Sequence, residues 1–378
     1  MEQVLYQLPA GWEWSSFDYI FSTKGFSVGK VKSSEVSHEG LVPVVDQSQI
    51  FIAGYSDCVE QTFSGKLPVL IYGDHTNCVK FVDFEFICGA DGTKVLAIED
   101  NIHPKYAFYL LSKFRPETQG YRRHFSLLKK MFLPVPPPDE QKRIVEKLDA
   151  LLTRIDSAIE HLQESVTLAD ALLKSSLSSM LTKQEHWDKV RLLDVCQITS
   201  KLCDPREEQY LDMFHIGGAN ITSFSGELID LKTARQENLI SGKFPFDNGM
   251  VLYSKIRPYL MKVARPSISG ICSADIYPLT PDNQIMSRDF LFYLLLSEQF
   301  TQYAIEGSSR AGMPKVNRNH LFNFKFHLPP VDEQMSICKS LDSLVVKTNE
   351  VSKELASKLS FLTGLKSSIL DSAFKGEL

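Results

Sequence analysis

The chain has 378 residues, of which 43% are hydrophobic and 23% are charged. This composition supports two or three globular units and excludes a disordered or collagen-like chain. The formal net charge of −5 argues against a protein that coats nucleic acid through bulk positive charge. No window is long and apolar enough to span a membrane, and the first residues lack a basic-then-apolar leader, so we expect a cytoplasmic protein. The seven cysteines are scattered and form no Cys-x-x-Cys pair, so we expect buried free thiols.

The first part of the chain predicts mixed α and β structure. Residues 67–72 and 79–82 are short apolar runs bounded by Gly, Asp and Asn, which predicts strands. Residues 106–111 form a continuous apolar run, which we interpret as a short buried helix. A strand remains the alternative there, because such a run has no period of its own.

A long helix is predicted from Asp139 to residue 184. Its apolar residues alternate at spacings of four and three, the pattern of a coiled-coil seam, and the stretch contains no Gly or Pro. The prolines before it, with Asp139 and Glu140 in the first turn, are typical of a helix start. The expected seam includes Leu148, Leu152, Ile155, Ile159 and Leu162.

The next part of the chain again predicts mixed structure followed by a long helix. Residues 249–253 form a strand-like run, and residues 290–296 form a second short buried helix. Asp332-Glu333 then begin a helix after prolines, as in the first half. Its expected seam includes Leu341, Val345, Leu355, Leu359 and Leu362, with Val351 and Leu365 on the same face.

The frame of the chain is an internal repeat. Val135-Pro-Pro-Pro-Asp-Glu-Gln141 returns as Leu328-Pro-Pro-Val-Asp-Glu-Gln334, and Trp12-Glu13 returns as Trp187-Asp188. Between these ends the two halves do not align, as expected of a scaffold that carries two different recognition surfaces. We therefore predict an α+β protein with two mixed α/β domains in tandem. The two long helices should pair as an antiparallel coiled coil with approximate two-fold symmetry.

Four segments follow from this organisation. The predicted boundaries are 1–134 for the first domain, 135–184 for its helical spacer, 185–327 for the second domain and 328–378 for its spacer.

Basic residues gather in three windows that contain no acid, 118–138, 248–274 and 307–331. In an acidic chain, such windows indicate local footprints for phosphates. The alternative for each window is an ordinary solvated face.

Two sets of residues are candidates for contact with nucleic acid. The turn 74–77 follows a predicted strand, and its side chains could read base edges, serve in general-base or metal chemistry, or simply form a turn. Tyrosine, arginine and lysine in the basic windows are suited to phosphates and guanine edges, but spacing does not separate base contacts from backbone contacts. The first set is Asp74, His75, Thr76, Asn77, Tyr121, Arg122, Arg123, His124 and Lys129, and the second is Lys255, Arg257, Tyr259, Arg310, Lys315, Asn317 and Arg318.

Several catalytic motifs are missing from the sequence. It contains no G-x-x-x-x-G-K phosphate loop, no G-x-S-x-G elbow and no amino-methyltransferase signature. Residues 138–142 superficially match the P-D…E-x-K pattern of metal-dependent nucleases. Adjacent carboxylates at a helix start point apart, however, and do not converge on one Mg²⁺. We therefore expect no catalytic residue and no metal site in this chain.

These motifs resemble those of the DNA-specificity subunit of type I restriction-modification systems. The resemblance covers the whole chain and depends on the doubled Pro-Pro-x-x-Glu-Gln entry to a long helix, the Trp-led starts and the final Ser372-Ala-Phe-Lys-Gly-Glu-Leu378. Residues 72–76 with 120–124 are similar to one family of target recognition domains, and residues 251–260 with 270–273 and 313–316 are similar to another.

The resemblance implies a non-catalytic subunit with two target recognition domains. Each domain would read one half of a bipartite double-stranded DNA target from the major groove, and the paired helices would set the gap between the half-sites. Two methyltransferase subunits would methylate adenine with S-adenosylmethionine. Endonuclease subunits that translocate DNA with ATP and Mg²⁺ would cleave unmethylated DNA, so this chain itself would bind no cofactor. The alternative is a stand-alone nucleic-acid-binding or scaffold protein without methyltransferase partners.

Overall fold

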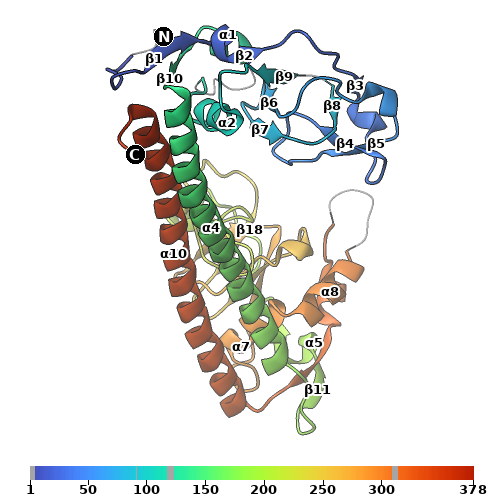
Figure 1. The fold of residues 1–378 in the computed structure, drawn as a ribbon. Coiled ribbons are helices and arrows are strands. Elements are labelled where there is room, and N and C mark those ends of the chain that lie inside the picture. Colours follow the sequence, from blue (N-terminus) through green and yellow to red (C-terminus); the bar gives the residue numbers. More distant parts are fainter. Residues whose placement is uncertain (1–4, 91, 117–122, 309–313) are drawn as a thin grey trace. The chain divides into compact units, whose positions relative to one another are not determined.

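The computed structural model describes residues 5–90, 92–116, 123–308 and 314–378. The chain divides into two compact units, whose elements are labelled in Figure 1. Unit 1 contains Met1–Gln163 and Ala356–Leu378, and unit 2 contains Glu164–Leu355. Each of the two long helices therefore contributes one end to each unit. No helix in the described ranges is long and apolar enough to cross a membrane.

Unit 1 begins with short strands and ends at the first long helix. Its elements are β1 (Glu13–Ser16), α1 (Phe17–Ile20), β2 (Phe21–Ser22), β3 (Lys30–Val31), η1 (Ser33–Glu35), β4 (Val42–Val45), β5 (Gly54–Ser56), η2 (Val59–Gln61), β6 (Val69–Gly73), β7 (Val79–Val82), β8 (Ile87–Gly89), β9 (Thr93–Ile98), α2 (Pro104–Lys113), α3 (Phe125–Leu128) and β10 (Phe132–Val135).

Two sheets and one strand pair organise the described part of unit 1. The order β2-β9-β6-β7 is antiparallel throughout, and Gly73 of β6 lies opposite Thr93 of β9. The order β3-β8-β4-β5 contains the parallel pairs β3/β8 and β4/β8. Strand β1 pairs with β10, so the beginning and the end of the domain meet where the first long helix starts.

Unit 2 has its strands and short helices between the two long helices. They are β11 (Asp188–Arg191), α5 (Leu192–Val195), β12 (Cys196–Gln197), α6 (Glu208–Leu211), β13 (Phe214–Ile216), β14 (Lys232–Thr233), β15 (Lys243–Phe246), β16 (Val251–Ser254), η3 (Pro258–Leu260), β17 (Val263–Ala264), β18 (Gly270–Ser273), β19 (Ile276–Pro281), α7 (Arg288–Leu295), α8 (Glu298–Glu306), α9 (Arg318–Phe322) and β20 (Lys325–Leu328).

The two units share a frame and differ in one sheet. The order β12-β19-β16-β17 matches β2-β9-β6-β7, and the pair β11/β20 matches β1/β10. The remaining sheet of unit 2 has the order β14-β13-β18-β15, in which β15 runs antiparallel to β18. Its counterpart in unit 1, β3, comes from an earlier place in the chain and runs parallel to β8. This difference explains why the two halves of the sequence align only at their ends.

The strands and short helices predicted from sequence are confirmed. The runs at 67–72, 79–82 and 249–253 overlap β6, β7 and β16, and the continuous apolar runs at 106–111 and 290–296 overlap the helices α2 and α7. All seven cysteines are free, as expected, and four of them are buried. Burial raises the pKa of Cys272 to about 12, so this thiol stays protonated at neutral pH.

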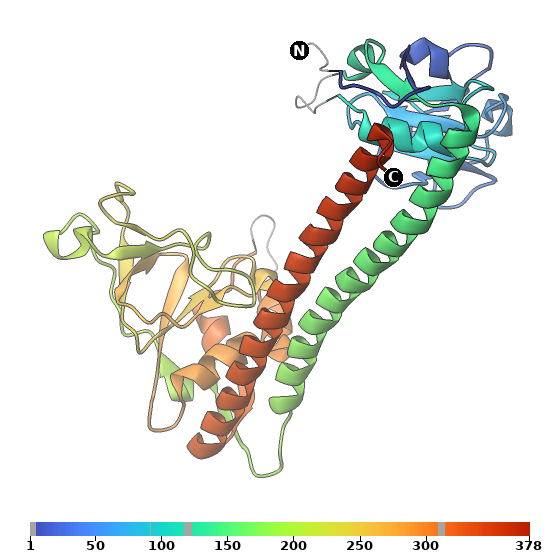
Figure 2. The ribbon, with the colours of Figure 1, turned by 60° about the vertical axis from the view of Figure 1, so that its left-hand side comes forward.

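The two long helices are α4 (Pro138–Met180), with 43 residues, and α10 (Val331–Lys375), with 45 residues. In unit 1 the beginning of α4 lies antiparallel beside the end of α10, and Asp156 forms an ion pair with Lys366 (2.6 Å) (Figures 1 and 2). In unit 2 the end of α4 lies beside the beginning of α10, where Leu177 and Leu341 share one core. In unit 1, Phe374 near the end of α10 is fully buried in the domain core.

The helix period, rather than the hydrophobicity of each residue, decides which residues lie in the seam between the two long helices. The ten seam residues named above for the two helices are all buried or half-buried. Val351 and Leu365, however, are 47% and 37% exposed, so placing them on this face was wrong. Thr348 and Ser352 occupy the seam positions of this stretch, because side chains that alternate at spacings of three and four share one face.

A buried glutamine joins each long helix to its domain. Gln141 Oε1 accepts a hydrogen bond from His103 N (2.7 Å), the residue that precedes α2, and Gln141 Nε2 donates to Pro136 O (3.0 Å). Gln334 makes the same contacts in unit 2, with Ser287 N (2.8 Å) and Pro329 O (2.9 Å). The repeated glutamine therefore fixes the start of the long helix against the start of a domain helix.

A repeated aspartate provides a second attachment about two turns further along each long helix. Asp149 accepts hydrogen bonds from Tyr109 (2.5 Å) and Lys105 (2.6 Å), both on α2. Asp342 accepts one from Tyr293 on α7 (2.6 Å) and pairs with Arg265. Burial, and then the hydrogen bond to the adjacent aspartate, raise the pKa of both tyrosines. Each domain helix is thus held to its long helix at two places.

We expect Gln334→Ala to lower the free energy of unfolding by about 1–3 kcal/mol, because it leaves buried backbone groups without partners. The exposed Gln284 in the same unit provides the matched control, Gln284→Ala. Thermal unfolding followed by calorimetry measures the difference. Equal midpoints for the two variants would contradict the role given to the buried amide.

Candidate nucleic-acid interface

The turn between β6 and β7 in unit 1 is held in place by two of the predicted contact residues. Asp74 is only 5% exposed, and its carboxylate accepts a hydrogen bond from Phe125 N (2.9 Å). Its backbone oxygen accepts a bond from His124 N (2.9 Å), and His124 is fully buried. These side chains are enclosed by the protein, so they join the turn to the segment that enters α3 rather than offer a surface to a partner.

Asn77 closes the same turn from within. Its φ is +58°, in the left-handed region, where asparagine is tolerated better than most residues. Its Oδ1 accepts a hydrogen bond from Tyr72 OH (2.7 Å), and its Nδ2 donates to Pro116 O (2.6 Å). At 7% exposure, Asn77 shapes the turn in the way that Asp74 does.

The outer part of the turn consists of His75, which is half-buried, and Thr76, which is exposed. Gln47, from the loop after β4, supports both, because its Oε1 accepts from His75 N (3.1 Å) and its backbone oxygen accepts from Thr76 Oγ1 (2.6 Å). Gly92 has a φ of +70°, where a side chain is strained, and a Cβ there would also lie 2.6 Å from Gln47 Nε2 and displace this amide. Sequence reasoning missed Gln47 because no nearby motif marks it.

Arg123 and Lys129 are both exposed beside this turn. Lys129 Nζ lies 5.3 Å from the ring centre of Phe125. Tyr121 and Arg122 lie outside the described residues. Because the Asp74 bonds tie α3 to the turn, unit 1 presents His75, Thr76, Arg123 and Lys129 from one connected substructure.

The hairpin between β16 and β17 occupies the corresponding place in unit 2. Arg257 and Met261, at its two sides, have φ values of +50° and +48°. Arg257 N donates a hydrogen bond to Pro314 O (2.9 Å), and Val316 N donates to Lys255 O (2.8 Å). The hairpin is therefore joined to the segment before α9, as the turn of unit 1 is joined to the segment before α3.

Two predicted lysines share one carboxylate beneath this hairpin. Lys255 Nζ lies 3.5 Å and Lys315 Nζ 3.3 Å from Asp275 Oδ1. Lys255 also donates a hydrogen bond to Ala274 O. Burial, and then the neighbouring Lys315, lower the pKa of Lys255, while Asp275 opposes this change. Two ammonium groups beside one carboxylate leave a local positive charge when all three are ionised.

The exposed residues of the second set are Arg257, Tyr259, Lys315, Asn317 and Arg318, and Tyr259 is 52% exposed. Asn317 has a structural task, because its Oδ1 accepts a hydrogen bond from His320 N (2.8 Å) and so caps α9. Arg310 lies outside the described residues. The second surface is thus cationic and aromatic, whereas the outer turn of unit 1 carries an imidazole and a hydroxyl.

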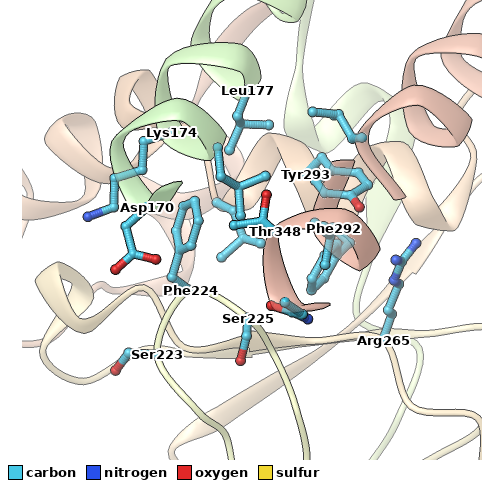
Figure 3. A pocket seen from close by; sticks show the side chains of 15 residues that line it. Asp170, Lys174, Leu177, Ser223, Phe224, Ser225, Arg265, Phe292, Tyr293 and Thr348 are labelled. Carbon is cyan, nitrogen blue, oxygen red and sulfur yellow. The ribbon is translucent and has the colours of Figure 1, made fainter. Parts of the chain in front are cut away.

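A cavity of about 370 Å³ lies inside unit 2, where α7 faces both long helices (Figure 3). Phe224, Phe292 and Leu177 supply an apolar lining, and Arg265 at its edge pairs with Asp289 (3.0 Å) and with Asp342. Unit 1 has a corresponding cavity of about 580 Å³ between α2 and the long helices. The repeated position shows that these cavities belong to the shared frame.

Within the ranges that the structure describes, no group of three or more His, Cys, Asp or Glu side chains could hold a metal ion.

Comparison with known proteins assigns the chain to a family. The family described as Type I restriction modification DNA specificity domain matches residues 32–168 and residues 184–360. The chain belongs to this family, and each match covers most of one predicted domain together with part of a long helix.

Individual relatives agree with this assignment. The chain is 30% identical over 278 residues to the type I restriction enzyme EcoDI specificity subunit of Escherichia coli, covering 65% of this chain and 62% of that protein. It is 26% identical over 272 residues to the StySPI specificity subunit of Salmonella potsdam, covering 65% of this chain and 57% of that protein. These matches therefore span less than two thirds of either relative.

A solved structure shares the fold. A chain from "Structural basis underlying complex assembly and conformational transition of the type I R-M system" superposes with a TM-score of 0.71 at 18% identity, over 99% of this chain and 100% of that chain. At this identity the likeness shows the fold alone, and it confirms the α+β architecture with long helices.

Two variants of Asn77 separate its backbone role from its side-chain role. Both Asn77→Gly and Asn77→Ala remove two side-chain hydrogen bonds, but only alanine is strained at a φ of +58°. We expect the alanine variant to be less stable than the glycine variant by about 1 kcal/mol. Equilibrium unfolding in urea measures this difference, and a glycine variant equal to or below alanine would contradict the left-handed turn.

Proposed function

We propose that this chain is the non-catalytic DNA-specificity subunit of a type I restriction-modification complex. Each unit binds one half of a bipartite double-stranded DNA target, the turn of unit 1 reading one half and the hairpin of unit 2 the other. The observation that carries this proposal is the pairing of one repeated frame with two chemically different exposed surfaces. The family membership supports the same reading.

The chemistry of the exposed side chains suits DNA. Arginine donates two hydrogen bonds to the O6 and N7 atoms of guanine, whereas threonine and histidine accept or donate single bonds at several base edges. Arg257 is held at its backbone by Pro314 and leaves its guanidinium exposed, so its position is set before any partner arrives. Such preorganisation reduces the entropy that binding must overcome.

The proposal assigns catalysis to partner subunits. Two methyltransferase subunits would use S-adenosylmethionine to methylate adenine in each half-site, and endonuclease subunits would use ATP and Mg²⁺ to translocate and cleave DNA. The repeated frame offers equivalent faces beside α2 and α7, which is consistent with two copies of one partner. A stand-alone nucleic-acid-binding or scaffold protein is the second candidate, and the absence of a methyltransferase partner in its host would favour it.

The test is methylome sequencing of a methylation-free host that expresses this chain with the adenine methyltransferase of its own system, compared with the methyltransferase alone. A bipartite motif methylated on adenine only when the chain is present supports the proposal. If both proteins are produced and co-purify but no such motif appears, specificity by this chain is refuted.

Single substitutions assign the half-sites. We expect Arg257→Ala to weaken recognition at one half-site only, by about 1–3 kcal/mol or roughly tenfold to a hundredfold in selectivity, because one bidentate base contact is lost. Arg123→Ala is expected to act on the other half-site. The readout is the fraction methylated at each half-site across a library of targets.

The control is Arg206→Ala, which removes an exposed arginine of unit 2 that pairs with Asp204 (2.7 Å). It should leave the motif unchanged. Equal relaxation of both half-sites by Arg257→Ala would argue against one domain reading one half.

The long helices are proposed to set the gap between the half-sites. Removing one heptad from each, residues 159–165 of α4 and 355–361 of α10, keeps the seam in phase and shortens each helix by about 10 Å. We expect the preferred gap to shrink by about 3 base pairs, at about 3.4 Å per base pair. The preferred gap is measured from the methylation of a series of targets with graded gaps. An unchanged preferred gap in an assembled complex would show that the long helices do not set it.

A further inference from the structure

Unit 1 contains an open groove of about 250 Å³ that no predicted site includes. Its lining includes Thr23 and Lys30 from one stretch of the chain, and Thr93 and Lys94 at the start of β9. Phe125 of α3 also lines it. The groove thus lies between the two sheets of the unit and next to the helix that follows the turn 74–77.

Two lysines, Lys30 and Lys94, line this groove, and Lys129 lies near its aromatic residue Phe125. Lys94 Nζ lies 5.7 Å and Lys129 Nζ 5.3 Å from the centre of the Phe125 ring. Lys30 stands at the groove on the neighbouring sheet. None of these three forms an ion pair with a residue that the structure describes. By contrast, Asp46, which directly follows β4, accepts a hydrogen bond from Ser48 N (2.9 Å) and lies 3.6 Å from Lys80.

A hydroxyl of a residue in the groove lining also lacks a partner among the described residues. Thr93 is 2% exposed, and its Oγ1 is buried with no hydrogen bond to any described residue. An unpaired buried hydroxyl costs free energy, so native proteins usually supply it with a protein atom, a water or a ligand. Its place in the lining of a groove flanked by Lys30 and Lys94 points to an anionic ligand rich in acceptor atoms.

We propose that this groove binds a backbone phosphate of the DNA, a step that rests on the function proposed above. Lysine binds phosphate as a point charge, and a threonine hydroxyl adds one hydrogen bond to a phosphate oxygen. Phosphate contacts set the register and orientation of a protein on the duplex, whereas base contacts select the sequence. The groove therefore positions the reading turn and does not itself choose bases.

The fold fixes the groove relative to that turn. Thr93 lies opposite Gly73, the last residue before the turn, in the β6/β9 ladder. Phe125, at the groove, donates its backbone N–H to Asp74 within the turn (2.9 Å). A phosphate held by Lys30 and Lys94 consequently constrains where Thr76 and His75 meet the base edges, because a hydrogen-bonded ladder joins the two places.

The experiment compares two double variants of the full chain in complex with its methyltransferase. Lys30→Gln with Lys94→Gln removes two groove charges, and Lys32→Gln with Lys66→Gln removes two charges elsewhere on unit 1. Dissociation constants are measured for a cognate and an unrelated duplex over a range of salt concentrations. We expect the groove variant to bind both duplexes about tenfold more weakly. The slope of log affinity against log salt concentration should be smaller in magnitude by about 1, and the ratio of cognate to unrelated affinity should be unchanged.

Thr93→Val provides a second, independent readout. Its hydroxyl has no protein partner, so removing it should not lower the unfolding midpoint, whereas it should weaken binding to both duplexes severalfold. Unweakened binding would remove the hydroxyl from the phosphate site.

The outcomes separate the groove from the proposed function. If the wild-type complex does not prefer its cognate duplex, the proposed function fails, and the phosphate assignment fails with it. If the wild-type complex prefers its cognate duplex, but both double variants have the same affinity and salt dependence as the wild type, only the groove assignment is overturned. A lost cognate preference in the groove variant would mean that the lysines contact bases. Tight binding of inorganic phosphate that leaves duplex binding unaffected would make the groove a small-anion site, which also overturns the proposal.

Discussion

The architecture depends on one buried amide used twice. Gln141 and Gln334 each satisfy backbone groups of the proline junction and of a domain helix start, at a point where the chain turns from a strand into a long helix. Because an amide offers both donors and an acceptor in fixed geometry, it sets the direction of the helix as well as its position. Once this junction and the contacts of Asp149 and Asp342 hold each long helix, the rest of each domain can vary without moving the helices.

The sequence predicted the frame well because the frame carries local signals. Prolines, acids in the first turn and a spacing of three and four each have a physical cause that acts within a few residues. The sheets between the frame elements were not predictable in detail. Strand β3 and its counterpart β15 differ in chain position and direction, and such pairing depends on contacts between distant residues. The misplacement of Val351 shows the same limit on a smaller scale, since hydrophobicity alone placed it on a face that the helix phase gives to Thr348.

The candidate interface was predictable only in part, because polar residues at turns can either bind a partner or form the hydrogen bonds that build the turn. Asp74, Asn77 and Asn317 have the side chains expected of a DNA contact, yet backbone groups use them to build the turn and to cap a helix. Local sequence does not distinguish a bonded amide from a presented one. Long cationic side chains such as Arg257 were easier to predict, because few structural tasks in a hairpin need them. Gln47 became visible only when the fold brought it to the turn.

The two units distribute positive charge in opposite ways. Lys255 and Lys315 share Asp275, which offsets one of their two charges, whereas Lys30 and Lys94 line an open groove and form no ion pair with a described residue. A charge already paired releases fewer counterions from DNA than an unpaired one, so unit 1 should contribute more of the salt-dependent affinity. Unit 2 exposes Arg257 and Tyr259 beside this partly neutralised lysine pair, so its binding would depend more on directional contacts. In a chain whose net charge is −5, such a groove would confine the attraction for DNA to a local patch of unit 1, while under the proposed function each domain still reads its own half-site.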